Sequence, residues 1–229
     1  MGDAERKNSS LADESSLRVS SSARLRVPTI GIEFEQQAQA EGFRFIAGVD
    51  EVGRGCLAGA VIAAAVILDL SKPLPVGLND SKKISAKNRE RLDAEIRAAA
   101  VCFAVGRIEA DQIDRINILQ ATKRAMISAV AQLNPAADFL LIDALQLKEL
   151  DLPQKAIIHG DAISASIAAA SIIAKTYRDN LMAELDQIYP EYGFAKHVGY
   201  GTKAHFAALR QHGACAIHRR TFRGVLPIE

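Results

Sequence analysis

Residues 46–55 read Ile-Ala-Gly-Val-Asp-Glu-Val-Gly-Arg-Gly, so an apolar run ends in two adjacent acids and a Gly-Arg-Gly segment follows. Carboxylates at the end of a buried strand are costly unless a cation, a metal ion or a raised pKa compensates them. Gly53 and Gly55 let backbone N–H groups approach a ligand closely, and Arg54 between them suits an anion. Acids that could hold a metal ion therefore precede donors that could hold a phosphate. A solvated loop is the alternative for this stretch taken alone.

The composition is that of an ordinary globular protein. The chain has 229 residues, 49% hydrophobic and 24% charged, which suits one large domain or a domain with an appendage. Its three cysteines, Cys56, Cys102 and Cys215, form neither a metal-ligand spacing nor a disulfide framework, so we expect a reducing cytoplasm. No apolar stretch approaches the ~20 residues that span a bilayer, and the N-terminus lacks a signal-peptide pattern, so we expect no membrane association.

The net charge of +1 conceals a basic C-terminal segment. From Phe194 to the end there are six Lys or Arg and one acid, and four of the five histidines also lie there. A basic segment on a neutral chain suggests a polyanionic partner such as nucleic acid. A helix with a solvated basic face is the alternative.

The pattern along the chain indicates an α/β domain between two appended segments. Residues 1–38 are serine-rich and lack a helical or strand period, so we expect a polar, disordered extension. Strands alternating with helices over residues 39–190 indicate a catalytic core around a central sheet, and a basic helical segment follows over residues 191–229. The expected strands are 44–49, 61–68, 101–108, 139–142 and 156–158, and the expected helices are 85–100 with Ser85 as N-cap, 111–133 as one helix or a pair, 164–188, and 202–212.

Three apolar runs end in acids: the first in Asp50 with Glu51, the next in Asp143 and the last in Asp161. Acids at the ends of neighbouring strands can converge at one edge of a sheet, where α/β folds bind ligands. Oxygen-only ligation suits Mg²⁺ or Mn²⁺, and two such ions ~4 Å apart can activate a water and stabilise the leaving oxygen of a phosphodiester.

Two of these acids could have simpler structural roles. Asp161 could be the N-cap of the long helix that follows, and Asp143 could be a turn residue. Because consecutive strand residues point to opposite faces, we also expect the strand to break or bulge if Asp50 and Glu51 share one site.

The sequence resembles the ribonuclease HII family from Phe45 to about Phe222. Several long motifs in order carry this resemblance. They are Gly-Val-Asp-Glu-Val-Gly-Arg-Gly (48–55), Asp-Ser-Lys-Lys (80–83), Leu-Ile-Asp (141–143), Gly-Asp-Ala (160–162), Ile-Ala-Ala-Ala-Ser-Ile-Ile-Ala-Lys (167–175), Arg-Asp (178–179) and Lys-His-Val-Gly-Tyr-Gly-Thr (196–202). The chain departs from the family at His159, where a lysine is usual.

The resemblance implies an RNase H-like fold, a mixed β-sheet flanked by helices, with a C-terminal helical extension. It implies an endoribonuclease dependent on Mg²⁺ or Mn²⁺ that hydrolyses the RNA strand of RNA–DNA hybrids and incises 5′ of single ribonucleotides in duplex DNA. Catalysis and metal binding would fall to Asp50, Glu51, Asp143 and Asp161. Substrate contacts would fall to Gly53, Arg54, Gly55, Lys82, Lys83 and Tyr200.

Some of these residues have an alternative interpretation as structural or surface residues. Without the resemblance, Lys82 and Lys83 could be a solvated pair, and Tyr200 could anchor its loop from the core. We expect Lys175, Arg178 and Asp179 to form a structural charge network on the long helix.

Competing functions are another RNase H-like nuclease, such as a junction resolvase or ribonuclease HIII, and a nucleic-acid-binding protein without activity. Ribonuclease HIII would have a folded N-terminal domain, for which about 40 polar residues are too few. A pure binding protein has no use for four carboxylates beside a phosphate site. We expect a monomer, and the C-terminal Gly-Val-Leu-Pro-Ile-Glu shows no motif for docking onto a sliding clamp.

Overall fold

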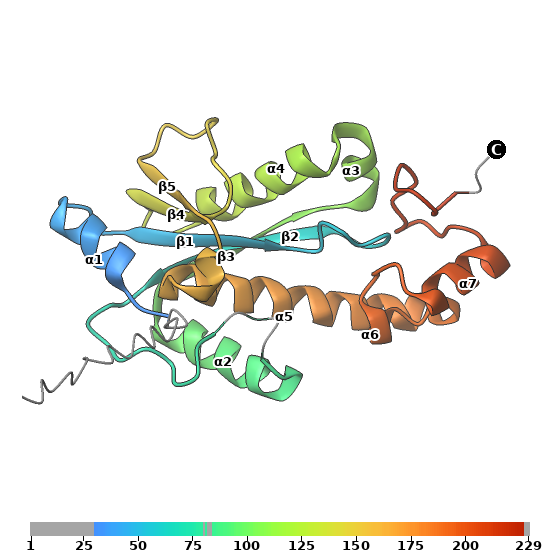
Figure 1. The fold of residues 1–229 in the computed structure, drawn as a ribbon, viewed down its shortest axis with the longest axis horizontal. Helices are drawn as coiled ribbons and strands as arrows, with labels where there is room; N and C mark the ends of the chain where they lie inside the picture. The colour runs from blue at the N-terminus through green and yellow to red at the C-terminus, as the bar shows by residue number, and fades with distance from the viewer. Residues whose placement is uncertain (1–29, 80, 82–83, 227–229) are drawn as a thin grey trace, which may run out of the picture.

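The centre of the molecule is a five-stranded mixed sheet, seen in a computed structural model that describes residues 30–79, 81 and 84–226 (Figure 1). The strand order is β3-β2-β1-β4-β5. The β1–β2 and β2–β3 pairs are antiparallel, whereas the β1–β4 and β4–β5 pairs are parallel. The strands are β1 (Ile46–Val52), β2 (Val61–Leu68), β3 (Ala100–Ile108), β4 (Phe139–Asp143) and β5 (Gln154–Ile157).

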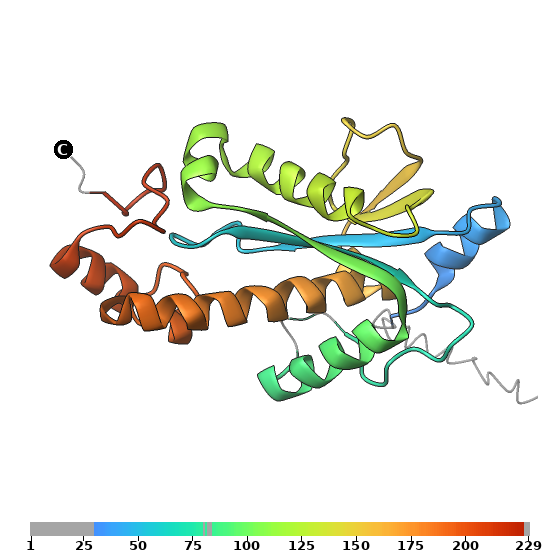
Figure 2. The same cartoon turned by 180° about the vertical axis from the view of Figure 1, so that it is seen from behind.

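Helices cover both faces of this sheet. In Figures 1 and 2, α3 and α4 lie on one side, and the long α5 lies with α2 on the other. No helix in the described part of the chain is long and apolar enough to cross a membrane. The helices are α1 (Glu33–Ala40), α2 (Ala86–Ala99), α3 (Ala110–Ile116), α4 (Ile118–Ala131), α5 (Ala165–Ile188), α6 (Phe194–His197) and α7 (Lys203–His212), with 3₁₀ turns η1 (Gly160–Ala162) and η2 (Pro190–Tyr192).

Strand β2 is buried at every position because helices pack on both sides of it. Its alternate side chains enter two different cores, one with α4 and the other with α2 and α5. A strand covered on both faces needs a continuous apolar run and not an alternating one. The predicted buried strand at 61–68 is therefore confirmed with the same bounds.

Helix α5 approaches β1 closely enough that only small residues fit between them. A Cβ atom on Gly48 would lie 2.0 Å from the carbonyl carbon of Ser166. Ala168, Ala169 and Ala170 of the helix are fully buried. This contact sets the height of α5 above the sheet, and with it the position of every side chain that the helix presents to the C-terminal end of β1.

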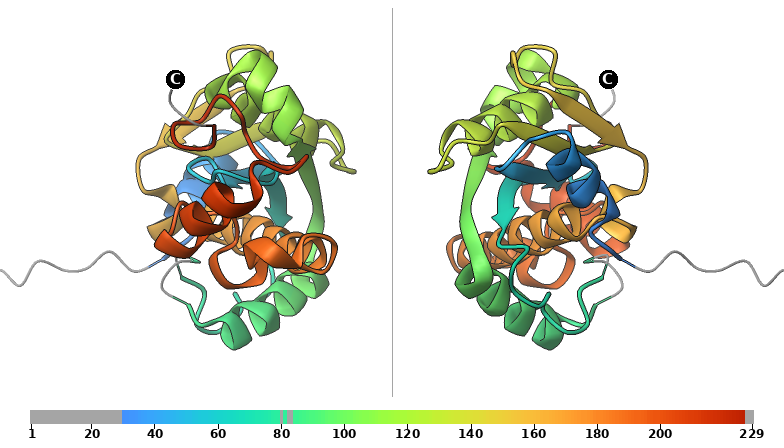
Figure 3. Two further views of the ribbon diagram at one scale, coloured as in Figure 1. Left: turned by 90° about the vertical axis from the view of Figure 1, so that its right-hand side faces the viewer. Right: turned by 90° about the vertical axis from the view of Figure 1, so that its left-hand side faces the viewer.

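The C-terminal helices pack at one end of α5, and α1 lies at the opposite end of the molecule (Figure 3). Their core is aromatic, and the Nε2 atoms of His205 and His218 lie 3.0 Å apart within it. Burial lowers the pKa of His205, and lowers that of His218 to about 4. Both rings are therefore neutral at pH 7. These two histidines therefore add no charge to the basic C-terminal segment at this pH.

A helix begins before the boundary that was predicted at residue 38 for the polar extension. Helix α1 starts at Glu33, and Glu35 within it is fully buried. The Glu35 Oε1 atom accepts hydrogen bonds from Ser164 Oγ at 2.7 Å and from the Ser166 N–H at 2.9 Å. A carboxylate at the N-terminus of α5 interacts favourably with the helix dipole, and the sequence pattern does not reveal it because no apolar stripe marks the contact. Residues 1–29 lie outside the described residues.

We expect Glu35→Ala to lower the free energy of unfolding by about 2–4 kcal/mol, because it removes a buried charge-assisted acceptor and leaves two donors unsatisfied. Urea denaturation followed by circular dichroism measures this change. Glu33→Ala is the matched control, since Glu33 lies on the exposed side of the same helix, and it should stay within about 0.5 kcal/mol of the parent. Equal effects of the two substitutions would contradict the anchoring role of Glu35.

Candidate active site

Two of the predicted acids lie side by side at the C-terminal ends of parallel strands. Strands β1 and β4 pair in parallel up to Val49 and Ile142, so Asp50 and Asp143 occupy the next position on each strand. Both follow the strand alternation onto the face that α5 covers, as Gly48 and Leu141 do. Asp143 is the last residue of β4, and it accepts a hydrogen bond from the N–H of Gly160. It is therefore more than a turn residue.

Asp50 is in an environment that disfavours its charge. Burial raises the pKa of Asp50 well above its ordinary value, and the negative charges of Glu51 and Asp143 raise it further. Hydrogen bonds from the Ser171 side chain and from the Glu51 N–H act in the opposite direction. A buried carboxyl group beside two other carboxylates favours either a proton or a bound cation. The donor set, all oxygen and all acidic, fits a hard divalent ion.

The expected break in β1 is absent. The pairing with β2 is regular through Asp50↔Ala64, Glu51↔Ala63 and Val52↔Ile62. Alternation along an unbroken strand directs Glu51 away from the face that carries Asp50. Its Oε1 atom lies 3.2 Å from Nη1 of Arg54, in the Gly-Arg-Gly segment. Arg54 therefore pairs with an acid in this structure while remaining 42% exposed at its side chain.

Asp161 is buried in the short turn η1, where it is 6% exposed. The N-cap of α5 is Ser164, whose Oγ accepts from the Ile167 N–H at 3.3 Å, so the capping interpretation of Asp161 is wrong. The preceding N–H of Gly160 donates to Asp143 Oδ1 at 2.8 Å and ties this turn to β4. In the described part of the chain, no three His, Cys, Asp or Glu side chains meet in metal-binding geometry. The structure thus places Asp50 and Asp143 on one face of the sheet, with Glu51 close enough to raise the pKa of Asp50 but directed to the other face. The metal-binding roles of these acids and of Asp161 stay predictions.

A buried arginine from α5 holds the glycine-rich loop that follows β1. Arg178 is fully buried, and it donates to the carbonyl oxygens of Ala60 at 3.2 Å, Val198 at 2.8 Å and Ala58 at 3.1 Å. Gly53 has φ +92°, and a Cβ atom there would lie 2.3 Å from Arg178 Nε. Glycine is thus required at position 53 by the fold itself.

A second buried arginine reaches the same loop from the C-terminal segment. Arg219 donates to the Gly59 carbonyl oxygen from Nε at 3.0 Å and from Nη2 at 2.9 Å, and to the Arg54 carbonyl oxygen from Nη1 at 2.9 Å. Burial, followed by the charge of Arg178, lowers the pKa of Arg219 to about 10. The guanidinium therefore remains protonated at neutral pH.

Tyr200 lies beside this loop, as its assignment to the site requires. The neighbouring Gly199 carbonyl oxygen accepts from the Leu57 N–H at 2.8 Å, which joins the two loops. Burial raises the pKa of the Cys56 thiol, and a hydrogen bond with the Tyr200 side chain acts in the opposite direction. Tyr200 is 43% exposed, so part of its ring faces solvent while its loop is anchored.

Known proteins share both the motifs and the fold. The sequence model described as ribonuclease HII matches residues 47–225. A ribonuclease HII of Desulfitobacterium hafniense is 58% identical over 191 residues, which cover 83% of this chain and 73% of that protein. The chain belongs to the ribonuclease HII family. It is therefore an endoribonuclease, and the family indicates ribonuclease H activity on RNA–DNA hybrids.

Solved structures of related enzymes confirm the predicted RNase H-like sheet with its C-terminal helices. The ribonuclease H2 of Pyrococcus horikoshii superposes with a TM-score of 0.67 at 25% identity, covering 80% of this chain and 95% of that one. The ribonuclease HII of Archaeoglobus fulgidus, solved as a complex with PCNA, also has a TM-score of 0.67, at 24% identity, covering 81% of this chain and 98% of that one.

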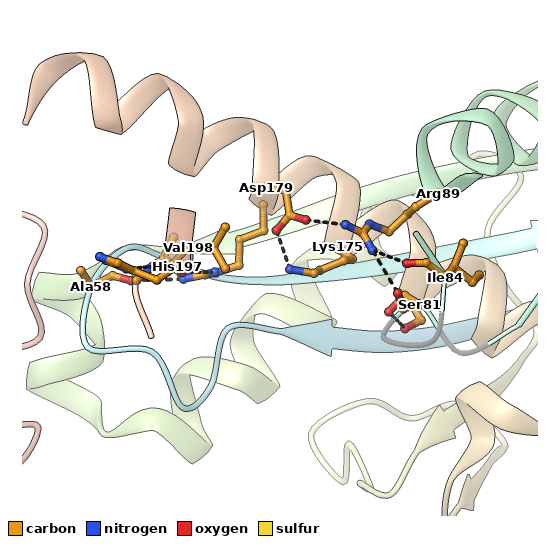
Figure 4. A network of polar contacts seen from close by, with 12 residues as sticks. Ala58, Ser81, Ile84, Arg89, Lys175, Asp179, His197 and Val198 are labelled. Atoms are coloured by element: carbon orange, nitrogen blue, oxygen red, sulfur yellow. Dashed lines mark hydrogen bonds and ion pairs between the residues drawn. The ribbon is translucent and has the colours of Figure 1, made fainter. Parts of the chain in front are cut away.

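A charge network on α5 anchors a second loop of this ribonuclease HII (Figure 4). Asp179 accepts from Lys175 at 2.6 Å and from Arg89 Nη2 at 2.9 Å. Arg89 Nη1 in turn donates to the carbonyl oxygens of Ser81 and Ile84, each at 3.1 Å. The predicted network is confirmed for Lys175 and Asp179. Arg178 does not join it but turns to the glycine-rich loop.

The anchored loop also touches the acid site. The Oγ atoms of Ser81 and Ser171 lie 2.8 Å apart, and Ser171 also bonds Asp50. Lys82 and Lys83, the predicted phosphate contacts, lie outside the described residues. Ser81 itself is connected to Asp50 through two hydrogen bonds, by way of Ser171.

The basic C-terminal segment is more than a charged surface. Sequence reasoning counted Arg219 among its solvent-facing charges, but the side chain is fully buried. The remaining basic residues are exposed: Lys196, Lys203, Arg210, Arg220 and Arg223. Removing this segment would therefore also remove the support of the glycine-rich loop. The segment therefore has a structural role, whether or not it also binds a polyanion.

The two glycines of the Gly-Arg-Gly segment should respond differently to alanine. Gly53→Ala should lower the free energy of unfolding by about 1–3 kcal/mol or more, because φ is +92° and the methyl group meets Arg178. Gly55→Ala should stay within about 0.5 kcal/mol, since nothing lies within 4 Å of its Cβ position. Thermal melting of both variants measures the difference, and a large loss at Gly55 would contradict it.

Proposed function

We propose that this ribonuclease HII incises 5′ of single ribonucleotides embedded in duplex DNA, besides acting on RNA–DNA hybrids. The observation that supports the proposal is that carboxylates and a glycine-rich loop lie next to each other. Buried Asp50 of β1 lies beside half-buried Asp143 of β4, and β1 leads directly into a glycine-rich loop whose open side is at Gly55. Acids that suit cations thus adjoin backbone donors that suit a sugar or a phosphate.

Asp50, Glu51, Asp143 and Asp161 would hold the divalent ions, either Mg²⁺ or Mn²⁺. The raised pKa of Asp50, caused by burial and by neighbouring carboxylates, supports a cation at this place. When bound, a pair of such ions activates a water and stabilises the leaving oxygen of a phosphodiester. The chain itself keeps Asp50 in place through Ser171 and keeps Asp143 in place through the N–H of Gly160.

Gly55 is the strongest candidate for a residue that recognises the ribose through its backbone. Its φ is outside the left-handed region and no atom lies within 4 Å of its Cβ position, so nothing inside the protein requires glycine there. Close approach of a substrate is a sufficient reason for it. The 2′-hydroxyl is the group that separates a ribonucleotide from a deoxyribonucleotide, and a backbone N–H or carbonyl can contact it only if no side chain intervenes.

The remaining contacts suit a duplex. Tyr200, partly exposed beside the loop, can pack its ring on a neighbouring sugar. The five exposed Lys and Arg of the C-terminal segment can bind phosphates of the backbone without regard to sequence. The three cysteines are free thiols, which supports a reducing, cytoplasmic setting, and we expect the enzyme to act there as a monomer.

Asp50→Asn and Asp143→Asn should each abolish incision of a duplex with one ribonucleotide, while the melting temperature stays equal or rises. Each substitution removes a ligand charge for the cation but also relieves repulsion among buried carboxylates. A gel assay of cleavage in Mg²⁺ and in Mn²⁺ measures activity, and a chelator should stop the parent enzyme. Asp111→Asn is the control, since that acid is exposed on α3. Full activity of either site variant in Mg²⁺ would refute the metal assignment.

Gly55→Ala should fold normally and lose most incision at a single ribonucleotide, because a methyl group then stands between the loop and the sugar. Tyr200→Ala should cut this incision more than cleavage of a continuous RNA–DNA hybrid, with a nearly unchanged melting temperature. Steady-state kinetics on both substrates separate these effects. If Tyr200→Ala lowered both activities equally and the melting temperature fell sharply, Tyr200 would be a structural anchor and not a substrate contact.

A further inference from the structure

Arg219 differs from Arg178 in one contact that bears on recognition. Both guanidiniums are fully buried, and both donate to carbonyl oxygens of the loop between β1 and β2. Arg178 bonds Ala58, Ala60 and Val198. Arg178 packs against Gly53, but of the two arginines only Arg219 hydrogen-bonds the Gly-Arg-Gly segment in the described residues, where its Nη1 donates to the Arg54 carbonyl oxygen at 2.9 Å.

That carbonyl belongs to the same peptide unit as the N–H of Gly55. A peptide unit is planar, and in its trans form the C=O and N–H bonds point in opposite directions. In the described residues, the cis peptide bond is Asn134–Pro135, so the Arg54–Gly55 unit is trans. Because the buried guanidinium holds the carbonyl oxygen, the N–H of Gly55 points in the opposite direction, away from Arg219. A Gly55 Cβ would meet no atom within 4 Å, so the surroundings of this residue are open.

Arg219 is itself fixed from several directions, so it can impose this orientation. Its N–H donates to the Leu57 carbonyl oxygen at 2.8 Å, and a β-bridge joins Ala58 to His218. The next two residues are held by Asp114 of α3, which accepts from the N–H groups of Arg220 and Thr221. No carboxylate in residues 30–79, 81 and 84–226 forms an ion pair with Arg219, so its donors are committed to loop carbonyls.

We infer that Arg219 is a positioning residue for ribonucleotide recognition, which turns the Arg54–Gly55 peptide so that the N–H of Gly55 faces the substrate. This inference rests on the proposed function. It also explains why the last part of the chain folds back onto the first strand pair. Without Arg219, a segment with two glycines would sample many orientations of this peptide, and ordering it would weaken binding.

The test compares Arg219→Lys with Arg178→Lys. Each keeps the positive charge and replaces a fork of donors by a single ammonium, at sites of equal burial. For Arg219→Lys, kcat/KM at a single embedded ribonucleotide should fall about tenfold more than kcat/KM on a continuous hybrid, the order expected for one charge-assisted hydrogen bond. For Arg178→Lys, both activities should change in proportion. Equal ratios for the two variants would overturn the inference.

A second measurement covers the case in which Arg219→Lys does not fold, and it uses the unaltered chain without divalent ions. The ¹⁵N–¹H signal of the Gly55 amide should shift when a duplex with one ribonucleotide is added, and shift less with the all-DNA duplex. Equal shifts, or none, would overturn the inference. If the parent enzyme binds and cleaves hybrids but does not incise at a single ribonucleotide, the proposed function fails, and that outcome is distinct from a failed role for Arg219.

Discussion

The close contact between α5 and β1 is the constraint on which the site depends. Gly48 and the alanines of α5 allow the helix backbone to lie against the strand. Beyond Ser171, which bonds Asp50, α5 continues to Ile188, a length of about 26 Å at 1.5 Å per residue. Ser171, Arg178 and Met182 follow one another along this helix and meet Asp50, the carbonyls of the glycine-rich loop, and Gly59, respectively. A shift of the helix would move Ser171, Arg178 and Met182 together, and would disturb all three contacts at once.

Two sets of charged groups lie along helix α5, the acids of β1 and β4 and two buried arginines, and each set is stabilised in a different way. The acids at the ends of β1 and β4 repel one another, and burial strengthens that repulsion. A few residues further on, two guanidiniums are buried without a carboxylate ion pair in the described chain. Their charges are solvated instead by backbone carbonyls of the loop. Arg178 and Arg219 are therefore committed to the backbone and do not form ion pairs with Asp50 or Asp143 in the described residues.

Much of this arrangement is visible in the sequence, for identifiable reasons. Local signals were reliable: the unbroken apolar run of β2, the Ser85 cap of α2, and the acids that end β1 and β4. Each depends on neighbours in the chain or on one face of an element. The single helix or helix pair expected at 111–133 proved to be a pair, divided at Asn117, whose positive φ ends α3 and whose side chain caps α4.

The features that sequence reasoning missed are buried charges with distant partners. Arg219 and Arg178 bond residues 118 to 165 positions away, so no local period marks them as interior. Glu35 is likewise buried against residues 129 and 131 positions away, and its helix was taken for part of a disordered extension. A break or bulge in β1 was expected only if Asp50 and Glu51 share one face, and the regular pairing of β1 shows no such break. Two adjacent acids need not share one face of a strand, because Glu51 finds Arg54 on its own side.

Adjacent residues of α5 explain how two flexible loops keep a fixed relation to each other. Arg178 holds the glycine-rich loop, and Asp179, about 100° around the helix, holds the Ser81 loop through Arg89. Each loop alone would lose much conformational entropy on binding a substrate. Anchored on consecutive positions of one rigid helix, both are ordered before substrate arrives. The proposed recognition of a single hydroxyl group would need this preorganisation, because a loop free to adjust would accept a sugar that lacks the hydroxyl.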